Sequence, residues 1–302
     1  MKRMKTALFI AISLVTVAFV WFWWRSTAGE RAGTPKAPGI VDILIGFVTN
    51  FFDMLGIGSF APTTAVFKLG KLVSDEKIPG TLNVGHTLPT AAEAFISIAI
   101  ITVDPITLIS MILASCAGSW LGAGIVSKWS RRNVQIGMGL ALIVAAVFFL
   151  LKQLKMLPGD EGSLGVDGTK LIIAIAGNFV LGALMTLGIG LFAPCMVLVA
   201  VLGMSPAVAY PIMMGSCAFL MPVGSVRFIR ERSYTLKSAL GLAIGGVPGV
   251  LLAAFWIKSM DVTKLRWVVI VVVTYTASMM LRSAMVERRS RGAVEIVPST
   301  GD

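Results

Sequence analysis

The sequence has few charged residues and a single histidine, His86. Asp, Glu, Lys and Arg make up 14% of its 302 residues, whereas a soluble domain has about 25%. This low charge, together with 56% hydrophobic residues, excludes an ordinary soluble domain. The lone histidine and the absence of a His-Glu-x-x-His motif or a paired acidic motif argue against an enzyme, so we expect no catalytic residues and no metal.

Cysteine is also scarce. The three residues, Cys116, Cys195 and Cys217, lie within apolar stretches and do not have the spacing of metal ligands, so no disulfide framework is expected. The sequence contains no P-loop or other nucleotide motif, which disfavours an ATP-driven pump. We therefore expect no cofactor.

What the sequence does contain is a series of long apolar runs. Several approach or exceed the roughly 20 residues that span a bilayer. Lys and Arg cluster at the ends of these runs, so the net charge of +11 suits a lipid bilayer as partner and not a nucleic acid. The runs cover residues 7–24, 40–69, 82–103, 106–126, 134–151, 171–202, 207–226, 239–257 and 267–281.

The first run resembles a signal sequence because it follows the basic segment Met1-Lys2-Arg3-Met4-Lys5. It ends, however, in Trp21-Phe22-Trp23-Trp24-Arg25, an aromatic belt of the kind found at membrane interfaces. Small residues for cleavage are missing there. We interpret this run as a retained anchor helix.

One eight-residue peptide occurs twice. Leu-Gly-Ile-Gly-x-Phe-Ala-Pro spans residues 55–62 and again 187–194, each time within an apolar run. Gly and Pro disfavour a continuous helix, so each run should break there. Further similarity, such as Gly118 with Gly249, indicates a tandem duplication. The predicted units are an anchor with its linker (1–37), a first repeat (38–152), an inter-repeat loop (153–169), a second repeat (170–285) and a cytoplasmic tail (286–302).

The charges of equivalent loops indicate that the two repeats are inverted. In the first repeat the loop after the broken segment carries Lys68, Lys71 and Lys77, and the next loop has no cation. In the second repeat the cations lie in the other loop, residues 227–237. Under the positive-inside rule this exchange predicts opposite orientations.

Inversion requires an odd number of crossings in each repeat. We therefore expect each broken segment to form a two-armed hairpin, with arms at residues 40–55 and 60–69 in the first repeat. The predicted fold class is an all-α polytopic membrane protein. It has two inverted-topology repeats, each with a broken, re-entrant helix hairpin, and an N-terminal anchor helix.

A helix that starts within the apolar phase directs unpaired N–H groups and the positive end of its dipole toward the break. Glycines let a ligand approach the backbone, and Pro62 and Pro194 suit the first helical position. Two such starts near the midplane predict an anion pocket without a buried Lys or Arg. The alternative is that Gly and Pro merely kink a span for close packing. The predicted substrate-binding residues are Gly56, Gly58, Phe60, Pro62, Thr63, Thr64, Asn83, His86, Gly188, Gly190, Phe192, Pro194, Cys195 and Ser216.

Three ionisable residues, Asp53, His86 and Glu93, lie within predicted spans of the first repeat. Each costs about 2.5–3.5 kcal/mol at a lipid-exposed helix centre, so we expect them to face protein or water. His86 and Glu93 are seven residues apart and share one helical face. All three are candidates for proton coupling. The alternative is a buried polar pair that orders helix packing, with Asn83 and Thr87 as partners.

Three features together resemble the sulfite exporter TauE/SafE family of membrane permeases. They are the doubled Gly-Ile-Gly-x-Phe-Ala-Pro segment, the turn Pro79-Gly80-Thr81-Leu82-Asn83 and the two-half layout, which cover nearly the whole chain after residue 38. Gly56-Ile57-Gly58 is less Gly-rich than the usual first motif of that family. The resemblance implies a transporter of small anions, often sulfur-containing ones such as sulfite or sulfonates.

These observations predict a secondary transporter, or permease, of the cell membrane with a cytoplasmic C-terminus. Its expected substrate is a small, sulfur-containing anion such as sulfite or an organosulfonate, moved by alternating access with proton coupling as an option. A passive anion channel is the alternative, and an intramembrane enzyme is a weaker one. Cys195 either contacts the substrate or is simply a small apolar residue at a helix start.

Overall fold

The structure is a computed structural model of the chain. It describes residues 2–27, 37–56, 58–74, 77–126, 162–185 and 191–258, and isolated residues between 136 and 154 and between 267 and 285. The described part is helical, with one isolated bridge between Ser163 and Met204. Within it, four helices are long and apolar enough to cross a membrane, at Arg3–Thr27, Gly168–Met185, Pro206–Arg230 and Leu236–Trp256. These helices confirm the predicted class of an all-α membrane protein for the described part of the chain.

The helices follow the predicted apolar runs closely. The predicted spans 134–151 and 267–281, the inter-repeat loop and the tail lie mostly outside the described residues. The described helices are α1 (Lys2–Thr27), α2 (Ile40–Met54), α3 (Phe60–Leu69), α4 (Ile78–Ile100), α5 (Pro105–Val126), α7 (Gly168–Met185), α8 (Phe192–Val201), α9 (Ala209–Arg230) and α10 (Leu236–Lys258), with a short 3₁₀ turn at Pro206–Val208 before α9.

Both predicted helix breaks are present. In the first, α2 ends at Met54 and α3 begins at Phe60; in the second, α7 ends at Met185 and α8 begins at Phe192. The expectation that each proline starts its short helix was wrong, because Pro62 and Pro194 are the third residues of α3 and α8. A proline fits there because N–H groups of the first turn have no intrahelical acceptor.

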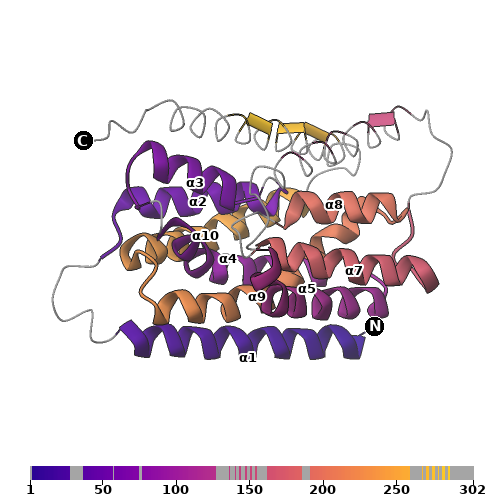
Figure 1. Ribbon diagram of the computed structural model, residues 1–302, viewed down its shortest axis with the longest axis horizontal. Helices are drawn as coiled ribbons and strands as arrows, with labels where there is room; N and C mark the ends of the chain where they lie inside the picture. Colours follow the sequence, from indigo (N-terminus) through magenta and orange to yellow (C-terminus); the bar gives the residue numbers. More distant parts are fainter. Residues whose placement is uncertain are drawn as a thin grey trace, which may run out of the picture.

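The two helical hairpins enter the bundle from opposite ends (Figure 1). At one end, the start of α2 lies against the Lys237 side chain of α10, and the Thr235 N–H donates to the Thr81 hydroxyl of α4 at 2.9 Å. At the other end, the Lys170 ammonium of α7 donates to the Leu202 carbonyl after α8 at 3.2 Å. The α2–α3 and α7–α8 hairpins therefore point toward each other with their tips in the interior.

We call the end that holds the start of α2 and the Lys237 side chain the basic end, because most of the described cations lie there. The opposite end holds Asp104 and Asp167 next to the starts of α5 and α7, along with Arg3, Lys5 and Lys170. The cations of the basic end are Arg25, Lys71, Lys77, Arg227, Arg230, Arg232 and Lys237.

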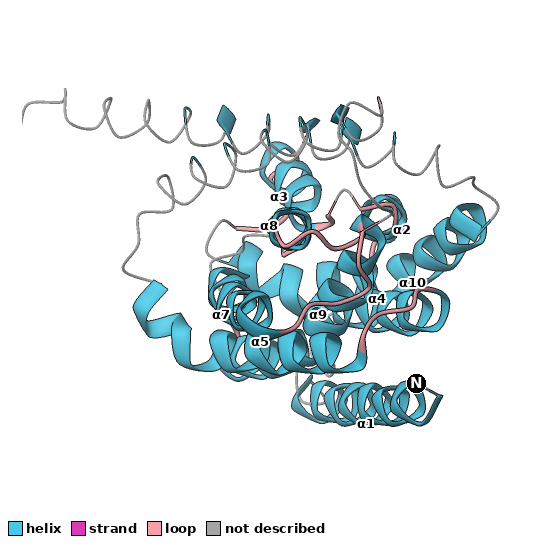
Figure 2. Cartoon of the chain, turned by 90° about the vertical axis from the view of Figure 1, so that its right-hand side faces the viewer, coloured by secondary structure: helices cyan, strands magenta, loops and turns pink. Residues whose placement is uncertain are grey.

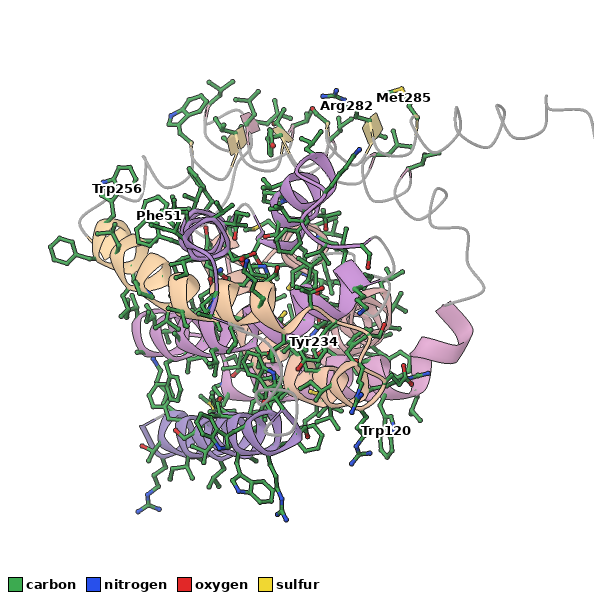
Figure 3. The ribbon with its side chains drawn as sticks, turned by 90° about the vertical axis from the view of Figure 1, so that its left-hand side faces the viewer. Phe51, Trp120, Tyr234, Trp256, Arg282 and Met285 are labelled. Carbon is green, nitrogen blue, oxygen red and sulfur yellow. The ribbon has the colours of Figure 1, made fainter. Side chains whose placement is uncertain are left out.

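Helices of the two predicted repeats interdigitate. The most extensive packing joins α2 with α10 and α5 with α7, so the first helix of each half packs on the last described helix of the other half. The pair α4 and α9 crosses between them at the centre. Aromatic contacts extend the α2–α10 interface, where the Phe51 and Trp256 rings lie 5.6 Å apart (Figure 3).

Glycines permit both of these interfaces. A Cβ atom on Gly118 of α5 would collide with the Phe179 carbonyl of α7, and one on Gly249 of α10 would collide with the Phe47 carbonyl of α2. Close backbone approach at small residues is a common way of packing membrane helices. The two contacts involve corresponding positions, since Gly249 follows Gly118 by 131 residues and Phe179 follows Phe47 by 132.

The N-terminal helix α1 covers α9 and α4 on one side of the bundle, and α3 and α8 lie toward the other side (Figure 2). Ile12 and Phe19 are buried at this contact, and the Trp23 indole donates to the Tyr234 hydroxyl at 3.2 Å. At its start, the Lys5 ammonium donates to the Ala99 carbonyl at 3.1 Å. The helix is therefore packed along its length.

Large apolar side chains cover much of the outer surface. Trp120 of α5 is 80% exposed and projects from the bundle (Figure 3). Phe255 of α10 is 76% exposed, and Leu14 of α1 is 65% exposed. Apolar patches of this extent are unusual on soluble monomers and suit contact with lipid.

Candidate functional site

The tip of the first hairpin is built from α2, α3 and the turn between them. Asp53, in the last turn of α2, accepts hydrogen bonds from the hydroxyl and the backbone N–H of Ser59, just before α3. The turn needs glycine twice, because Gly56 and Gly58 have φ angles of 101° and 81°. A carboxylate of the chain therefore already occupies the start of α3, where we had expected only glycines, a proline and hydroxyl groups.

His86 connects three helices at this tip. Its Nδ1 lies 2.9 Å from the Asn50 side-chain oxygen on α2, so this nitrogen donates. Its Nε2 lies 3.2 Å from the Thr63 hydroxyl on α3. The Phe60 ring packs on the imidazole, with centroids 5.7 Å apart. Both ring nitrogens thus have partners, and the imidazole is fully buried.

The alternative in which Asn83 and Thr87 are the partners of a buried pair of His86 and Glu93 was wrong. The Asn83 amide instead donates to the Pro79 carbonyl of its own helix at 2.9 Å. The Thr87 hydroxyl donates to the Asn83 carbonyl at 2.6 Å and lies 3.3 Å from the Ser225 hydroxyl of α9. Both side chains turn to backbone groups of α4, because a polar group in an apolar environment bonds to the nearest carbonyl one turn back.

Glu93 lies two turns beyond His86 on α4 and has a different environment. Its side chain is 0% exposed, and neither carboxyl oxygen has a hydrogen-bond partner. The Asp53 carboxyl and the Cys217 thiol of α9 are close enough to interact with it electrostatically. Among the described residues no cation forms an ion pair with it. His86 and Glu93 share a helix but do not form a pair.

The tip of the second hairpin is rich in sulfur. The Cys217 thiol of α9 donates to the Met185 sulfur at the end of α7, at 3.6 Å. Cys195 in the first turn of α8 is fully buried and interacts electrostatically with Cys217. Cys217 also lies within electrostatic reach of Asp53 on α2 and Glu93 on α4.

A second buried polar contact joins α7 to α9 and α5. The Asn178 amide of α7 donates to the Ser216 hydroxyl of α9 at 3.2 Å and to the Met111 carbonyl of α5 at 2.6 Å. Its own side-chain oxygen has no partner although it is buried. The arrangement parallels Asn50 with His86, since in each half an asparagine of the first hairpin arm contacts the residue after a helical glycine.

One hydrogen bond joins the first hairpin tip directly to the second half. The Tyr210 hydroxyl, at the start of α9, donates to the Leu55 carbonyl at 3.2 Å. Leu55 is the C-cap residue immediately after α2, so this carbonyl has no helical donor of its own.

The predicted site residues divide into three groups. Those brought together near the tips are Gly56, Gly58, Phe60, Thr63, His86, Pro194 and Cys195, with Asp53 and Glu93 beside them. Pro62 and Thr64 are half-buried on α3, while Asn83 bonds within α4 and Ser216 lies at the Asn178 contact. Gly188 and Gly190 fall outside the described residues, as does the side chain of Phe192.

Five participants were missed in the sequence: Asn50, Ser59, Met185, Asn178 and Tyr210. Asn50 and Asn178 could have been found, because each is an uncharged polar residue inside an apolar run. Met185 carries no such signal, although it occupies the position equivalent to Asp53, 132 residues later.

Comparison with known proteins gave no assignment. No model of a protein family, no curated protein and no solved structure matches this chain.

Proposed function

We propose that the protein is a secondary transporter of a small anion, which binds between the tips of the two hairpins. The observation that carries this proposal is the entry of the α2–α3 and α7–α8 hairpins from opposite ends of one bundle, with both tips held against α9 through the Tyr210–Leu55 and Cys217–Met185 contacts. Non-helical backbone at membrane depth is tolerated where protein buries it or where it lines a water-filled cavity, and in transporters such breaks form substrate sites.

The proposal includes two inverted repeats. Their support is the reciprocal packing of α2 on α10 and α7 on α5, with corresponding glycines at both contacts. The clustering of cations at the basic end supports a cytoplasmic location for that end. Arg3, Lys5 and Lys170 are exceptions to this charge distribution, since they lie at the opposite end with the starts of α1 and α7. Alternating access follows if one half rocks against the other around the tips.

The second tip is the better receptor for an anion. Both α3 and α8 present the N–H groups of a helix start, but Asp53 already accepts from Ser59 at the first. At the corresponding position the second half has Met185, which is neutral. An anion at the α8 start would therefore meet a helix dipole without a competing carboxylate.

The class of anion comes from the resemblance of the doubled peptide to the sulfite exporter family. Sulfite or a sulfonate has three oxygen acceptors on a compact centre, which suits a cluster of backbone N–H donors. Within this class the most direct experiment is an uptake screen in vesicles reconstituted with purified protein. It compares sulfite, sulfate, thiosulfate, methanesulfonate and a carboxylate with a cation and a neutral solute.

We expect saturable uptake of at least one sulfur oxyanion. Met185→Glu places a carboxylate at the second tip, and like-charge repulsion of about 2.8 kcal/mol should lower kcat/KM about a hundredfold. Met185→Gln is the matched control, because it has a similar size without the charge. Preference for a cation or a neutral solute would contradict the anion site. Uptake that never saturates would indicate a passive channel.

A further inference from the structure

We infer that Glu93 is the proton-binding residue of the transport cycle, and that His86 is a structural residue. The inference rests on the proposed function and adds to it the coupling ion and its site. Its basis is the contrast between two buried side chains of α4. Both ring nitrogens of His86 have hydrogen-bond partners, whereas neither carboxyl oxygen of Glu93 has one.

The His86 ring has no vacant nitrogen. Asn50 accepts from Nδ1 and Thr63 contacts Nε2, so the imidazole holds α2, α3 and α4 together through both atoms. A second proton on this ring would require the Thr63 hydroxyl to turn from donor to acceptor. Binding a proton here would also create a charge that the described residues do not compensate.

The Glu93 carboxyl is in the opposite situation. It is completely buried, and neither oxygen receives a hydrogen bond. An ionised carboxylate would lack both solvation and compensating donors in this place, which is costly in an apolar interior. Buried polar groups without partners are rare in native proteins and call for a functional explanation. A bound proton supplies one, since it removes the charge without needing another residue.

Among the side chains that the structure describes, the surroundings of Glu93 contain acids and thiols but no compensating base. Asp53 faces it from α2, and the Cys217 thiol faces it from α9. The other helices packed on α4 are α1, α3 and α10, and their described cationic side chains lie toward the ends of the bundle, as Lys5 and Lys237 do. Two carboxyl groups that interact in a dry interior do not readily carry charge together.

This arrangement couples the proton to the anion. Glu93 interacts with Cys217, whose thiol contacts Met185 at the tip proposed to receive the substrate. An anion there is repelled by an ionised Glu93 and tolerated by a protonated one. By linkage, the anion then strengthens proton binding as much as the proton strengthens anion binding. The two ions would cross together.

Two measurements test the inference on the purified full-length chain. The first is an infrared titration in vesicles without any anion, which follows the carbonyl stretch of a protonated carboxylic acid. We expect a band at neutral pH in the wild type that is lost in Glu93→Gln. The matched control is Glu231→Gln, because Glu231 is an exposed glutamate paired with Arg227. A band that survives in Glu93→Gln would overturn the inference.

The second measurement uses the best-transported anion of the uptake screen. An inward proton gradient should drive accumulation in the wild type and in Glu231→Gln. In Glu93→Gln, accumulation should fall by about tenfold or more, while anion-for-anion exchange continues because it requires no net proton movement. Glu93→Asp should restore part of the accumulation. Normal gradient-driven accumulation in Glu93→Gln would refute the proton role.

The two failures can be told apart. If no anion is transported by the wild type, the proposed function fails while the infrared band still reports on the proton at Glu93. If transport is present and the proton gradient acts equally on Glu93→Gln, the transporter stands and Glu93 has no part in coupling.

Discussion

Substituting the two glycines at the reciprocal interfaces is the sharpest test of how the halves pack. Gly118→Ala adds a methyl group where α5 meets the Phe179 carbonyl, and Gly249→Ala adds one where α10 meets the Phe47 carbonyl. In each case the obstacle is backbone of another helix, so it cannot move aside as a side chain could. The helices would have to separate.

The expected size of the effect follows from two opposing contributions. Alanine is favoured over glycine within a helix by about 0.5–1 kcal/mol. Overpacking of a tight interface costs about 1–3 kcal/mol, and a backbone obstacle places these sites in the upper part of that range. We therefore expect each variant to lose roughly 1–2 kcal/mol of stability. The two losses should be similar if the halves are packed alike.

Gly224 of α9 provides the control, since a Cβ atom there would meet no other atom within 4 Å. Gly224→Ala should leave stability unchanged or raise it slightly. Thermal unfolding of the purified variants in detergent, followed by tryptophan fluorescence, measures the difference. Each kcal/mol corresponds to a Tm shift of about 2–4 °C in larger domains. If Gly118→Ala and Gly249→Ala melt at the same temperature as Gly224→Ala, the close approach of these helices is incorrect.

Three further predictions concern the centre and the ends of the bundle. A double-mutant cycle between His86→Ala and Asn50→Ala should give a coupling energy of about 0.6–1.7 kcal/mol in thermal unfolding, and additive effects would show that these side chains do not interact. Tyr210→Phe removes one hydroxyl from the first hairpin tip and should cost about 0.5–1.5 kcal/mol by the same assay, whereas an unchanged Tm would mean that this hydrogen bond contributes nothing. In a chain without its own cysteines, Lys71→Cys and Asp167→Cys should react with an impermeant thiol reagent from opposite sides of the membrane; reaction from one side only would refute the opposite entry of the hairpins.

The two hairpins could be predicted from the sequence, because helix breaks depend on neighbouring residues. The arm predicted at residues 60–69 is α3, and the arm predicted at 40–55 is α2 with one residue fewer. Glycine and proline act on their own turn of the chain, so a doubled break can be recognised without knowing what surrounds it. The exact start of each short helix could not be recognised, because a proline is tolerated anywhere in the first turn.

The partners of the buried polar groups were not predictable in the same way. Helical periodicity correctly placed His86 and Glu93 on one face of α4, yet one is fully bonded and the other has no partner. The difference depends on which helix lies beside each turn. Asn50 is 36 residues from His86 in sequence, and Tyr210 is 155 residues from Leu55.

The sequence alone determined that the protein is helical, that it is apolar enough for a membrane, and that its chain breaks twice in matching places, because each of these depends on composition or on neighbouring residues. Only the tertiary structure decided that α2 packs on α10 and α7 on α5, that Asp53 caps the first hairpin tip while Met185 leaves the second uncharged, and that Glu93 has no partner. The physical reason is that a periodic pattern specifies the face a residue occupies on its own helix. The rotation and neighbours of that helix come from close packing against segments far away in the chain.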